Sequence, residues 1–331
     1  MPELPEVETI VRDLNKAVLG RKIEGVWSDF KETARLRSSF AKALVDKKCF
    51  GGQVKKPDFK EFKKEIKGKK IKKIWRRGKN IIFELSGNKT LLIHQKMTGH
   101  LLFGNWQREK KQWKAKISGP LADDPKNKFL HLIFWLDNNK QLALSDLRKF
   151  AKVELWDAKD FKESEEFKSL GPEPLEKNFT FGKFKEQIRY QAKPASVSLS
   201  AKLRRGKVKQ ILMDQTVIAG IGNIYSDEIL WKAKIHPFHD ISKLKDNELK
   251  RIYQAMREIL AKAIELGGES FSDYRRLSGE KGYFDKERKV YRREGEPCFR
   301  CGTIIKRVKL GGRSAHFCPE CQSLTNSISM L

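Results

Sequence analysis

The stretch LMDQTVIAGIGNIY, residues 212–225, has two glycines two positions apart, and we expect them to open a helix near Asn223. Free backbone N–H groups at such a helix start can hold a phosphate. Taken alone, Gly-x-Gly-Asn fits a plain capped turn better than a ligand site. Lys207 and Lys209 lie just upstream, however, and these cations favour contact with a nucleic-acid backbone.

Helical patterns surround this stretch, so we expect the second half of the chain to be mainly helical. The spacing of apolar residues predicts helices over 180–191, 207–214, 223–233 and 246–266. The turn-rich segment GPEP, residues 171–174, precedes them and indicates a domain boundary.

The first half of the chain has a different pattern. An amphipathic helix is expected from Pro5 to about Gly20, because apolar residues recur there every three or four positions. Short runs of Ile, Leu, Phe and Trp follow and predict a β-sandwich or barrel, in which the lysine-rich stretch 107–128 is expected to be a long loop. The predicted strands are 73–75, 81–85, 91–94, 129–136, 141–144 and 153–156.

The charge of the chain points to a polyanionic partner. It has 331 residues, 39% of them hydrophobic, and 70 Lys+Arg against 42 Asp+Glu, a formal net charge of +28. Such an excess makes nucleic acid the first candidate, although lysines that only solvate the surface would give the same total. The sequence contains no apolar run long enough for a membrane span and no secretory signal pattern, so we expect a cytoplasmic protein without membrane contact.

Four of the five cysteines have the spacing of a zinc site. Cys298 and Cys301 form one Cys-x-x-Cys pair, and Cys318 and Cys321 form a second. Four unrelated thiols or a redox pair are less favoured, because two such pairs at this separation are typical of four-thiolate zinc. Four ligands leave no open position, which predicts one structural zinc ion bracing a Gly-Gly-Arg tip at 311–313 that suits a phosphate.

The chain begins Met1-Pro2-Glu3. If Met1 is removed, Pro2 presents a secondary amine, which gives a cationic iminium when it attacks a sugar aldehyde carbon. The alternative is that these residues are only the start of a helix.

Together these pieces resemble the formamidopyrimidine-DNA glycosylase family, bacterial DNA repair enzymes that excise oxidised purines. The matching segments run from end to end in family order: PELPEVE at 2–8, RRGKN at 76–80, HQKMTGHL at 94–101, SDLRKF at 145–150, GPEPL at 171–175, LMDQTVIAGIGNIYSDEIL at 212–230, and the two cysteine segments from 282 to 322.

The resemblance implies a multidomain α+β fold and a DNA substrate. It implies an N-terminal β-sandwich with flanking helices over 1–160, a helix-two-turns-helix domain with a lesion-covering loop over 170–290, and a zinc-finger hairpin over 291–331. It further implies a glycosylase and AP lyase of base excision repair. This enzyme would act as a monomer on double-stranded DNA containing oxidised bases, in the bacterial cytoplasm with its nucleoid.

The resemblance also implies roles for single residues. Pro2 would attack C1′ of the damaged nucleoside, and Glu3 would assist opening of the sugar ring. Lys79 would donate the proton of β-elimination, and Arg313 would grip phosphate and serve δ-elimination. The implied DNA contacts are Met97, Arg148 and Phe150 in the gap left by the flipped base, and His94, Asn127, Arg204, Lys209 and Asn223 on the backbone.

Two alternatives and several departures remain. An endonuclease VIII-like enzyme would use the same chemistry on oxidised pyrimidines, and a damaged-DNA-binding protein would keep the clamp without the chemistry. Gln95-Lys96 replaces the Leu-Gly common in the family, and stretches 36–73 and 104–128 are longer and more basic than usual. Gly267-Gly268-Glu269-Ser270 replaces a frequent Gly-Gly-Thr-Thr before the covering loop, so lesion preference is the least specified property.

Overall fold

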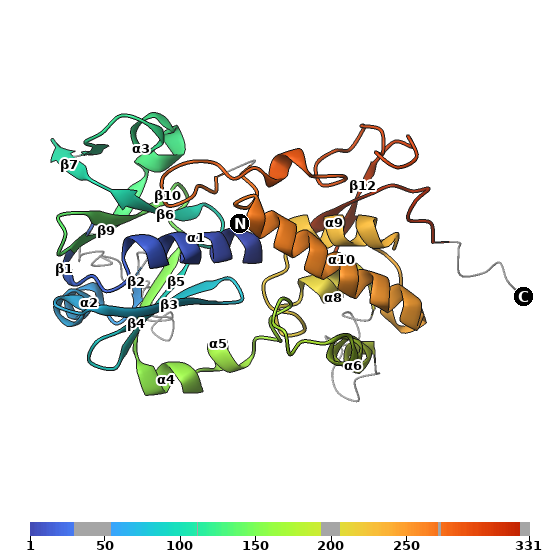
Figure 1. Cartoon of the computed structure of the whole chain (residues 1–331), viewed down its shortest axis with the longest axis horizontal. Helices are drawn as coiled ribbons and strands as arrows, with labels where there is room; N and C mark the ends of the chain where they lie inside the picture. The colour runs from blue at the N-terminus through green and yellow to red at the C-terminus, as the bar shows by residue number, and fades with distance from the viewer. Residues whose placement is uncertain (30–53, 111, 193–205, 271–272, 325–331) are drawn as a thin grey trace, which may run out of the picture. The chain divides into compact units, whose positions relative to one another are not determined.

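The computed structural model describes residues 1–29, 54–110, 112–192, 206–270 and 273–324 (Figure 1). The chain divides into two compact units. The first contains Met1–Pro2, Glu6–Lys168 and Gly267–Gly282, and the second contains Glu3–Pro5, Ser169–Leu266 and Tyr283–Leu331. Each unit has its own hydrophobic core.

The first unit is built around two packed β-sheets, as the sequence predicts. One sheet has the strand order β1-β9-β10-β6 and the other has β2-β11-β5-β4-β3. All pairings are antiparallel except that of β2 with β11. The strands are β1 (Ile23–Ser28), β2 (Val54–Lys56), β3 (Ile71–Arg77), β4 (Asn80–Leu85), β5 (Lys89–His94), β6 (Gly99–Gly104), β9 (Leu130–Leu136), β10 (Gln141–Asp146) and β11 (Lys152–Asp157).

Side chains from both sheets meet in one core. Phe134 on β9 and Phe83 on β4 are both almost completely buried in it. Helix α1 (Leu4–Ala17) adds Val7 and Ile10 from its apolar face, and α2 (Phe59–Ile66) adds Phe62. Burying each large side chain of this kind stabilises the fold by about 1.5–3 kcal/mol. The short helices α4 (Ala158–Glu163) and α5 (Glu165–Lys168) follow β11.

The lysine-rich stretch 107–128 is not the long loop that we expected. It contains most of the hairpin of β7 (Trp106–Glu109) and β8 (Gln112–Ala115), then α3 (Pro120–Asp123) and the 3₁₀ turn η2 (Pro125–Lys128). Trp106, Trp113 and Leu121 pack on a second small core on the four-stranded sheet. These scattered apolar residues order the segment despite its many lysines.

The second unit is helical and confirms the four predicted helices to within two residues at each end. They are α6 (Phe181–Ala192), α8 (Val208–Met213), α9 (Asn223–Ala233) and α10 (Asp246–Glu265). Helix α9 is buried on most sides, and α10 packs along it through residues such as Leu249, Ile252 and Met256. Strands β12 (Lys306–Leu310) and β13 (Arg313–Phe317) form the C-terminal hairpin. The predicted α+β class is therefore confirmed. No helix within the described ranges is long and apolar enough to cross a membrane.

Candidate nucleic-acid interface and metal centre

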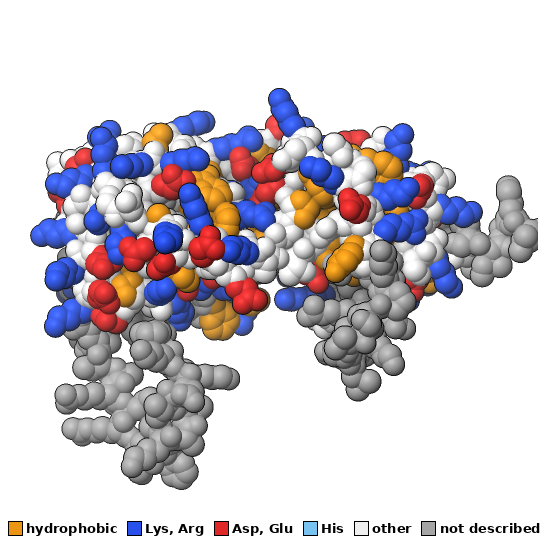
Figure 2. Space-filling model, turned by 90° about the horizontal axis from the view of Figure 1, so that it is seen from below, with side chains coloured by type: hydrophobic (Ala, Val, Ile, Leu, Met, Phe, Trp, Pro, Cys, Tyr) orange, Lys and Arg blue, Asp and Glu red, His pale blue; other side chains and the backbone are white. Residues whose placement is uncertain are grey.

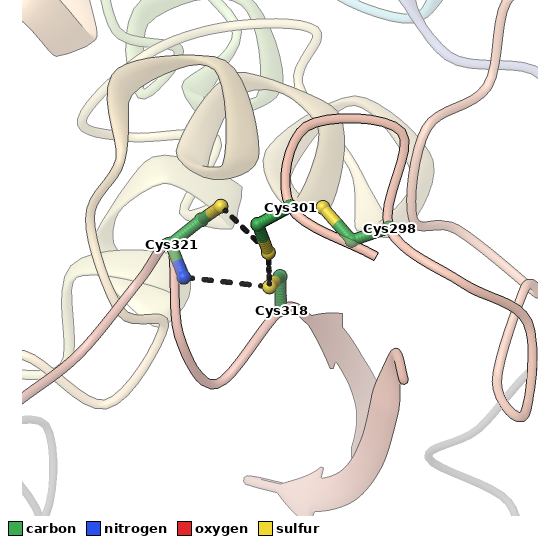
Figure 3. Close-up of side chains that lie close together, drawn as sticks. All are labelled: Cys298, Cys301, Cys318 and Cys321. Atoms are coloured by element: carbon green, nitrogen blue, oxygen red, sulfur yellow. Dashed lines mark hydrogen bonds between the residues drawn. The ribbon is translucent and has the colours of Figure 1, made fainter. Parts of the chain in front are cut away.

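The four predicted cysteines converge on one point (Figure 3). Their sulfur atoms all lie within 4.8 Å of one another, and the Sγ atoms of Cys301 and Cys318 are 3.4 Å apart. A tetrahedral zinc with four 2.3 Å bonds to sulfur requires an S···S separation of about 3.8 Å, so the four thiolates fit this ion. The Trp231 indole N–H also donates to Cys298 Sγ at 3.4 Å, an outer contact that fixes the ligand's orientation.

The hairpin next to these cysteines carries Arg313 at an exposed position. Gly311 and Gly312 form its turn with φ angles of +56° and +79°, which residues with a side chain rarely adopt. A shallow cavity of about 340 Å³ lies at the tip, lined by the cations Arg307, Lys309 and Arg313. Three cations at a fixed turn suit an anion such as phosphate.

Lys209 has a different position from the one we expected. Its side chain is 1% exposed, and its Nζ lies 2.5 Å from Asp227 Oδ1 and donates to the Ser314 carbonyl at 2.7 Å. Burial lowers the pKa of Lys209, and the Asp227 carboxylate opposes that shift. The other Asp227 oxygen accepts the backbone N–H of His316 at 3.0 Å. Lys209 therefore joins α8 and α9 to the hairpin from inside, and this position does not suit the direct phosphate contact predicted for it.

The start of α9 is also occupied differently. The Glu3 carboxylate accepts the backbone N–H groups of Gly222 at 2.7 Å and Ile224 at 2.9 Å. Glu3 is 2% exposed, and a Cβ at Gly222 would lie 2.4 Å from its carboxyl carbon. Two of the N–H groups that could have held a phosphate therefore hold Glu3 instead. Asn223, the first residue of α9, is half-buried beside them.

In the first unit, Lys79 and His94 lie near each other. Lys79 follows the turn residue Gly78, and its neighbour Asn80 pairs with His94 across β4 and β5. Burial, followed by the charges of Lys96 and Lys79, lowers the pKa of His94 to about 3. His94 Nδ1 accepts the Lys96 N–H at 2.9 Å, so the neutral ring carries its proton on Nε2. It can donate a hydrogen bond there without carrying a charge. Pro2 also belongs to this unit and is buried, whereas Met1 is exposed.

The predicted trio Met97, Arg148 and Phe150 forms one exposed cluster. Met97 is 40% and Phe150 is 50% exposed, which is unusual for large apolar side chains. The Arg148 guanidinium contacts Met97 Sδ at 3.4 Å and lies over the Phe150 ring at 4.7 Å. An apolar wedge with an attached hydrogen-bond donor can fill the space of a base that has left its stack.

Asp146 positions this cluster, and sequence reasoning missed it. Its carboxylate is completely buried and accepts the backbone N–H groups of Arg148 at 3.3 Å and Ala151 at 2.7 Å. It also accepts the Thr98 hydroxyl. The available signal was an acidic residue at the end of an apolar strand, directly before an exposed basic turn.

Asn127 is buried and does not lie on the surface that we expected. Its Oδ1 lies 3.0 Å from His100 Nε2, and its Nδ2 donates to the Gly279 carbonyl at 3.3 Å. It therefore ties η2 to the segment 273–282, where the covering loop was predicted. Arg275 pairs with Asp124 and Arg276 with Asp13, and both pairs hold the same segment. Arg204 lies outside the described residues.

The surplus positive charge does not by itself identify an interface. Lysine and arginine side chains are spread over the face shown in Figure 2, with acidic side chains between them. The site is better defined by the specific positions described above than by overall charge.

The comparisons with known proteins cover nearly the whole length of the chain. Residues 1–153 match the model of the formamidopyrimidine-DNA glycosylase N-terminal domain, 170–275 match the H2TH domain of the same glycosylase, and 295–324 match the zinc finger found in FPG and IleRS. A protein of Pelotomaculum thermopropionicum named formamidopyrimidine-DNA glycosylase is 36% identical over 98% of this chain and 100% of its own.

Solved structures of Lactococcus lactis Fpg are similar as well. A mutant bound to Fapy-dG-containing DNA has a TM-score of 0.75 and 34% identity over 97% of this chain and 100% of the other. The wild-type protein bound to DNA with an oxidised pyrimidine has a TM-score of 0.74 and 34% identity over the same shares.

Proposed function

The chain belongs to the formamidopyrimidine-DNA glycosylase family, and we propose that it repairs double-stranded DNA by excising oxidised purines such as 8-oxoguanine and formamidopyrimidines. It is a base-excision-repair DNA glycosylase with AP lyase activity, and it has one structural zinc site of four cysteines. We further propose which lesion it excises, which residues carry out each step, and that it acts as a monomer in the bacterial cytoplasm.

The observation that carries the proposed chemistry is the position of Glu3. Its carboxylate, next in sequence to Pro2, is fixed by the N–H groups that begin α9. Once Met1 is removed, the Pro2 amine attacks C1′, and the damaged base leaves with the electron pair of the glycosidic bond and takes a proton from water. Glu3 takes the proton that the amine loses and passes it to the ring oxygen as the sugar opens to the iminium.

The later steps need a proton donor and an anion clamp. The iminium is an electron sink and favours loss of the 3′ phosphate by β-elimination, in which Lys79 serves as proton donor. Loss of the 5′ phosphate by δ-elimination follows, and the exposed Arg313 binds the departing anion. The zinc site supplies no chemistry and holds the hairpin that carries Arg313.

We assign recognition of the flipped state to the trio. Extruding a base costs a few kcal/mol, which Met97 and Phe150 offset by stacking in the vacated space. Arg148 lies over Phe150 and donates to the orphaned cytosine. Asn223 is proposed to contact phosphate, and His94 to donate to it as a neutral imidazole. Because one chain contains both the proposed catalytic residues and the proposed DNA-contacting residues, we propose that the protein acts as a monomer. We also propose that it acts on nucleoid DNA in the bacterial cytoplasm.

Borohydride trapping tests the covalent step. Protein whose Met1 has been removed, as checked by mass spectrometry, should form a reduced adduct with a duplex containing 8-oxoguanine opposite cytosine. A matched variant with one glycine inserted before Pro2 keeps every side chain but moves the amine, and it should form none. Absence of an adduct with the processed protein would support the damaged-DNA-binding alternative.

The endonuclease VIII-like alternative is tested by substrate choice. Excision of 8-oxoguanine opposite cytosine should be faster than excision of thymine glycol under single-turnover conditions. The reverse order would favour oxidised pyrimidines as the main substrate. This alternative is supported by the similar Lactococcus lactis Fpg, which was solved with DNA containing an oxidised pyrimidine.

A further inference from the structure

A cavity of about 820 Å³ lies in the first unit, and the proposed repair chemistry does not use it. Its walls include Trp27 on β1, Leu130 on β9, Leu121 on α3, and Trp106 and Trp113 on the β7–β8 hairpin. Among the residues that the sequence predicted to contact DNA, Asn127 is the one that lines the described part of the cavity. The volume falls in the range of about 300–1,000 Å³ that is typical of small-molecule sites.

Indole rings dominate one side of the cavity. The rings of Trp27 and Trp113 meet edge to face with centroids 5.1 Å apart, and Trp135 lies behind them with its ring 6.2 Å from that of Trp113. Trp27 and Trp113 are both half-exposed at the cavity, so part of each ring surface remains accessible. Aromatic surfaces of this kind bind planar bases by stacking, with about 1–3 kcal/mol per base.

Cations outnumber anions around these rings. Among the described residues, Arg108, Lys114 and Lys128 line the cavity against a single carboxylate, Asp29. That carboxylate already has two partners, a hydrogen bond with His131 Nδ1 at 2.7 Å and an ion pair with Lys149 Nζ at 3.2 Å. Burial raises the pKa of Asp29, but these partners lower it by more and keep the group ionised.

Two of these cations, Arg108 and Lys114, can bind an anionic group in the cavity. The Arg108 guanidinium lies over the Trp27 ring at 5.5 Å, directly beside the aromatic wall. Lys114 pairs with Glu109 at 2.6 Å, but both side chains are at least half exposed, and such surface pairs contribute only about 0–1 kcal/mol. A phosphate can therefore compete for Lys114 at little cost.

We propose that this cavity is a second nucleotide-binding site, in which a base stacks on one of the two indole rings, Trp27 or Trp113, and meets the other at its edge, while its phosphate contacts Arg108 and Lys128. The chemistry recognised is a planar base joined to a phosphate, which a free nucleoside monophosphate and an unpaired nucleotide of a DNA strand both offer. No covalent step is involved, and the site is independent of Pro2, Glu3 and Lys79.

Nitrogen–proton correlation spectra of the seven tryptophan indoles test this proposal on the full chain. Titration with deoxyguanosine monophosphate or hexathymidylate should shift the signals of Trp27, Trp106 and Trp113 to saturation, while those of Trp75 and Trp231 stay in place. A response to the monophosphate identifies a free nucleotide as a ligand, and a response to hexathymidylate alone identifies a strand. No selective shift with either probe, or equal shifts with deoxyribose phosphate, would overturn the proposal.

Three variants sharpen the test. Arg108→Glu should weaken nucleotide binding roughly tenfold or more, as expected from the loss of a charge-assisted contact. Lys116→Glu makes a similar charge change on the same segment outside the cavity lining, and it should bind normally. Trp113→Leu keeps an apolar side chain but removes the stacking plane and should also abolish binding. Equal affinities in all three variants would contradict the site, and unchanged 8-oxoguanine excision would show that the enzyme remains folded.

Discussion

The Glu3 carboxylate accepts the backbone N–H of Gly222 at 2.7 Å. The side chain of Glu3 is therefore held in place by a segment that lies more than two hundred residues away in the sequence. This contact explains why the motif around 220–225 needs a glycine next to Asn223. Gly222 has φ −135°, which any residue can adopt, so the restriction is the space taken by Glu3 and not the backbone angle.

Gly222→Ala should therefore displace Glu3 and slow base excision. Its Cβ would lie 2.4 Å from the Glu3 carboxyl carbon, so the carboxylate must move. A misplacement of this size in a catalytic group can cost about 10²-fold in rate, and single-turnover excision of 8-oxoguanine measures it. Gly182→Ala is the matched control, because its Cβ meets only Thr180 Oγ1 at 3.7 Å. Wild-type excision by Gly222→Ala would contradict the role of Glu3.

Lys209→Met should destabilise the protein strongly. It leaves the completely buried Asp227 without its ammonium partner, and breaking a buried pair in this way costs about 3–5 kcal/mol. Chemical denaturation measures the change, with Lys250→Met, an exposed lysine on α10, as the control.

The salt dependence of DNA binding separates Lys209 from Arg313. Each phosphate contact contributes about 0.9 to the slope of log affinity against log salt. Arg313→Gln should reduce this slope by about one, whereas Lys209→Met should leave it unchanged. A reduced slope for Lys209→Met would restore Lys209 as a direct phosphate contact.

Gln95→Leu should stabilise the protein. Gln95 is 1% exposed, and neither polar atom of its amide has a hydrogen-bond partner among the described residues. Replacing a buried, unsatisfied amide with an apolar group of similar size recovers about 1–3 kcal/mol, seen as a higher unfolding midpoint. Gln141→Leu is the control with the opposite sign, because the Gln141 Oε1 accepts the Trp106 N–H. A lower midpoint for Gln95→Leu would indicate an unseen partner.

Acid should destabilise the protein partly through His94. Burial, and then Lys96 and Lys79, lower its pKa from 6.5 to about 3. Between these values the unfolded chain binds a proton that the folded chain does not, so stability falls as the pH falls through this window. His94→Gln should flatten this loss in denaturation curves taken between pH 6.5 and 4. In the wild type, an imidazole NMR titration with a midpoint near 6.5 would contradict the half-buried, neutral ring.

The sequence predicts the parts of this molecule that depend on local pattern. The four helices from 180 to 266 and the four-cysteine site follow from periodicity and spacing, and both are confirmed. Strands β1 and β6 were missed, because β1 contains a glycine and alternates poorly, and β6 begins and ends with glycine. Their place is decided by pairing with β9 and β10, which is a tertiary effect.

The positions of charged groups were the hardest to predict. Lys209 looks like a surface cation in the sequence, and only the presence of Asp227 on another helix makes its burial stable. The N–H groups at the start of α9 look available in the sequence, and only the fold brings Glu3 to them. Both positions have the same explanation, since the partner of a polar group is set by contacts distant in sequence.

The division of the chain into units has a consequence for dissecting this protein. Glu3–Pro5 belong to the unit formed mainly by the C-terminal half, and Gly267–Gly282 belong to the unit formed mainly by the N-terminal half. A gene split after codon 168 would yield a first fragment without Leu277, whose carbonyl accepts the Phe103 N–H, and a second fragment without Glu3. Neither half contains a complete folding unit, and we expect neither to fold by itself.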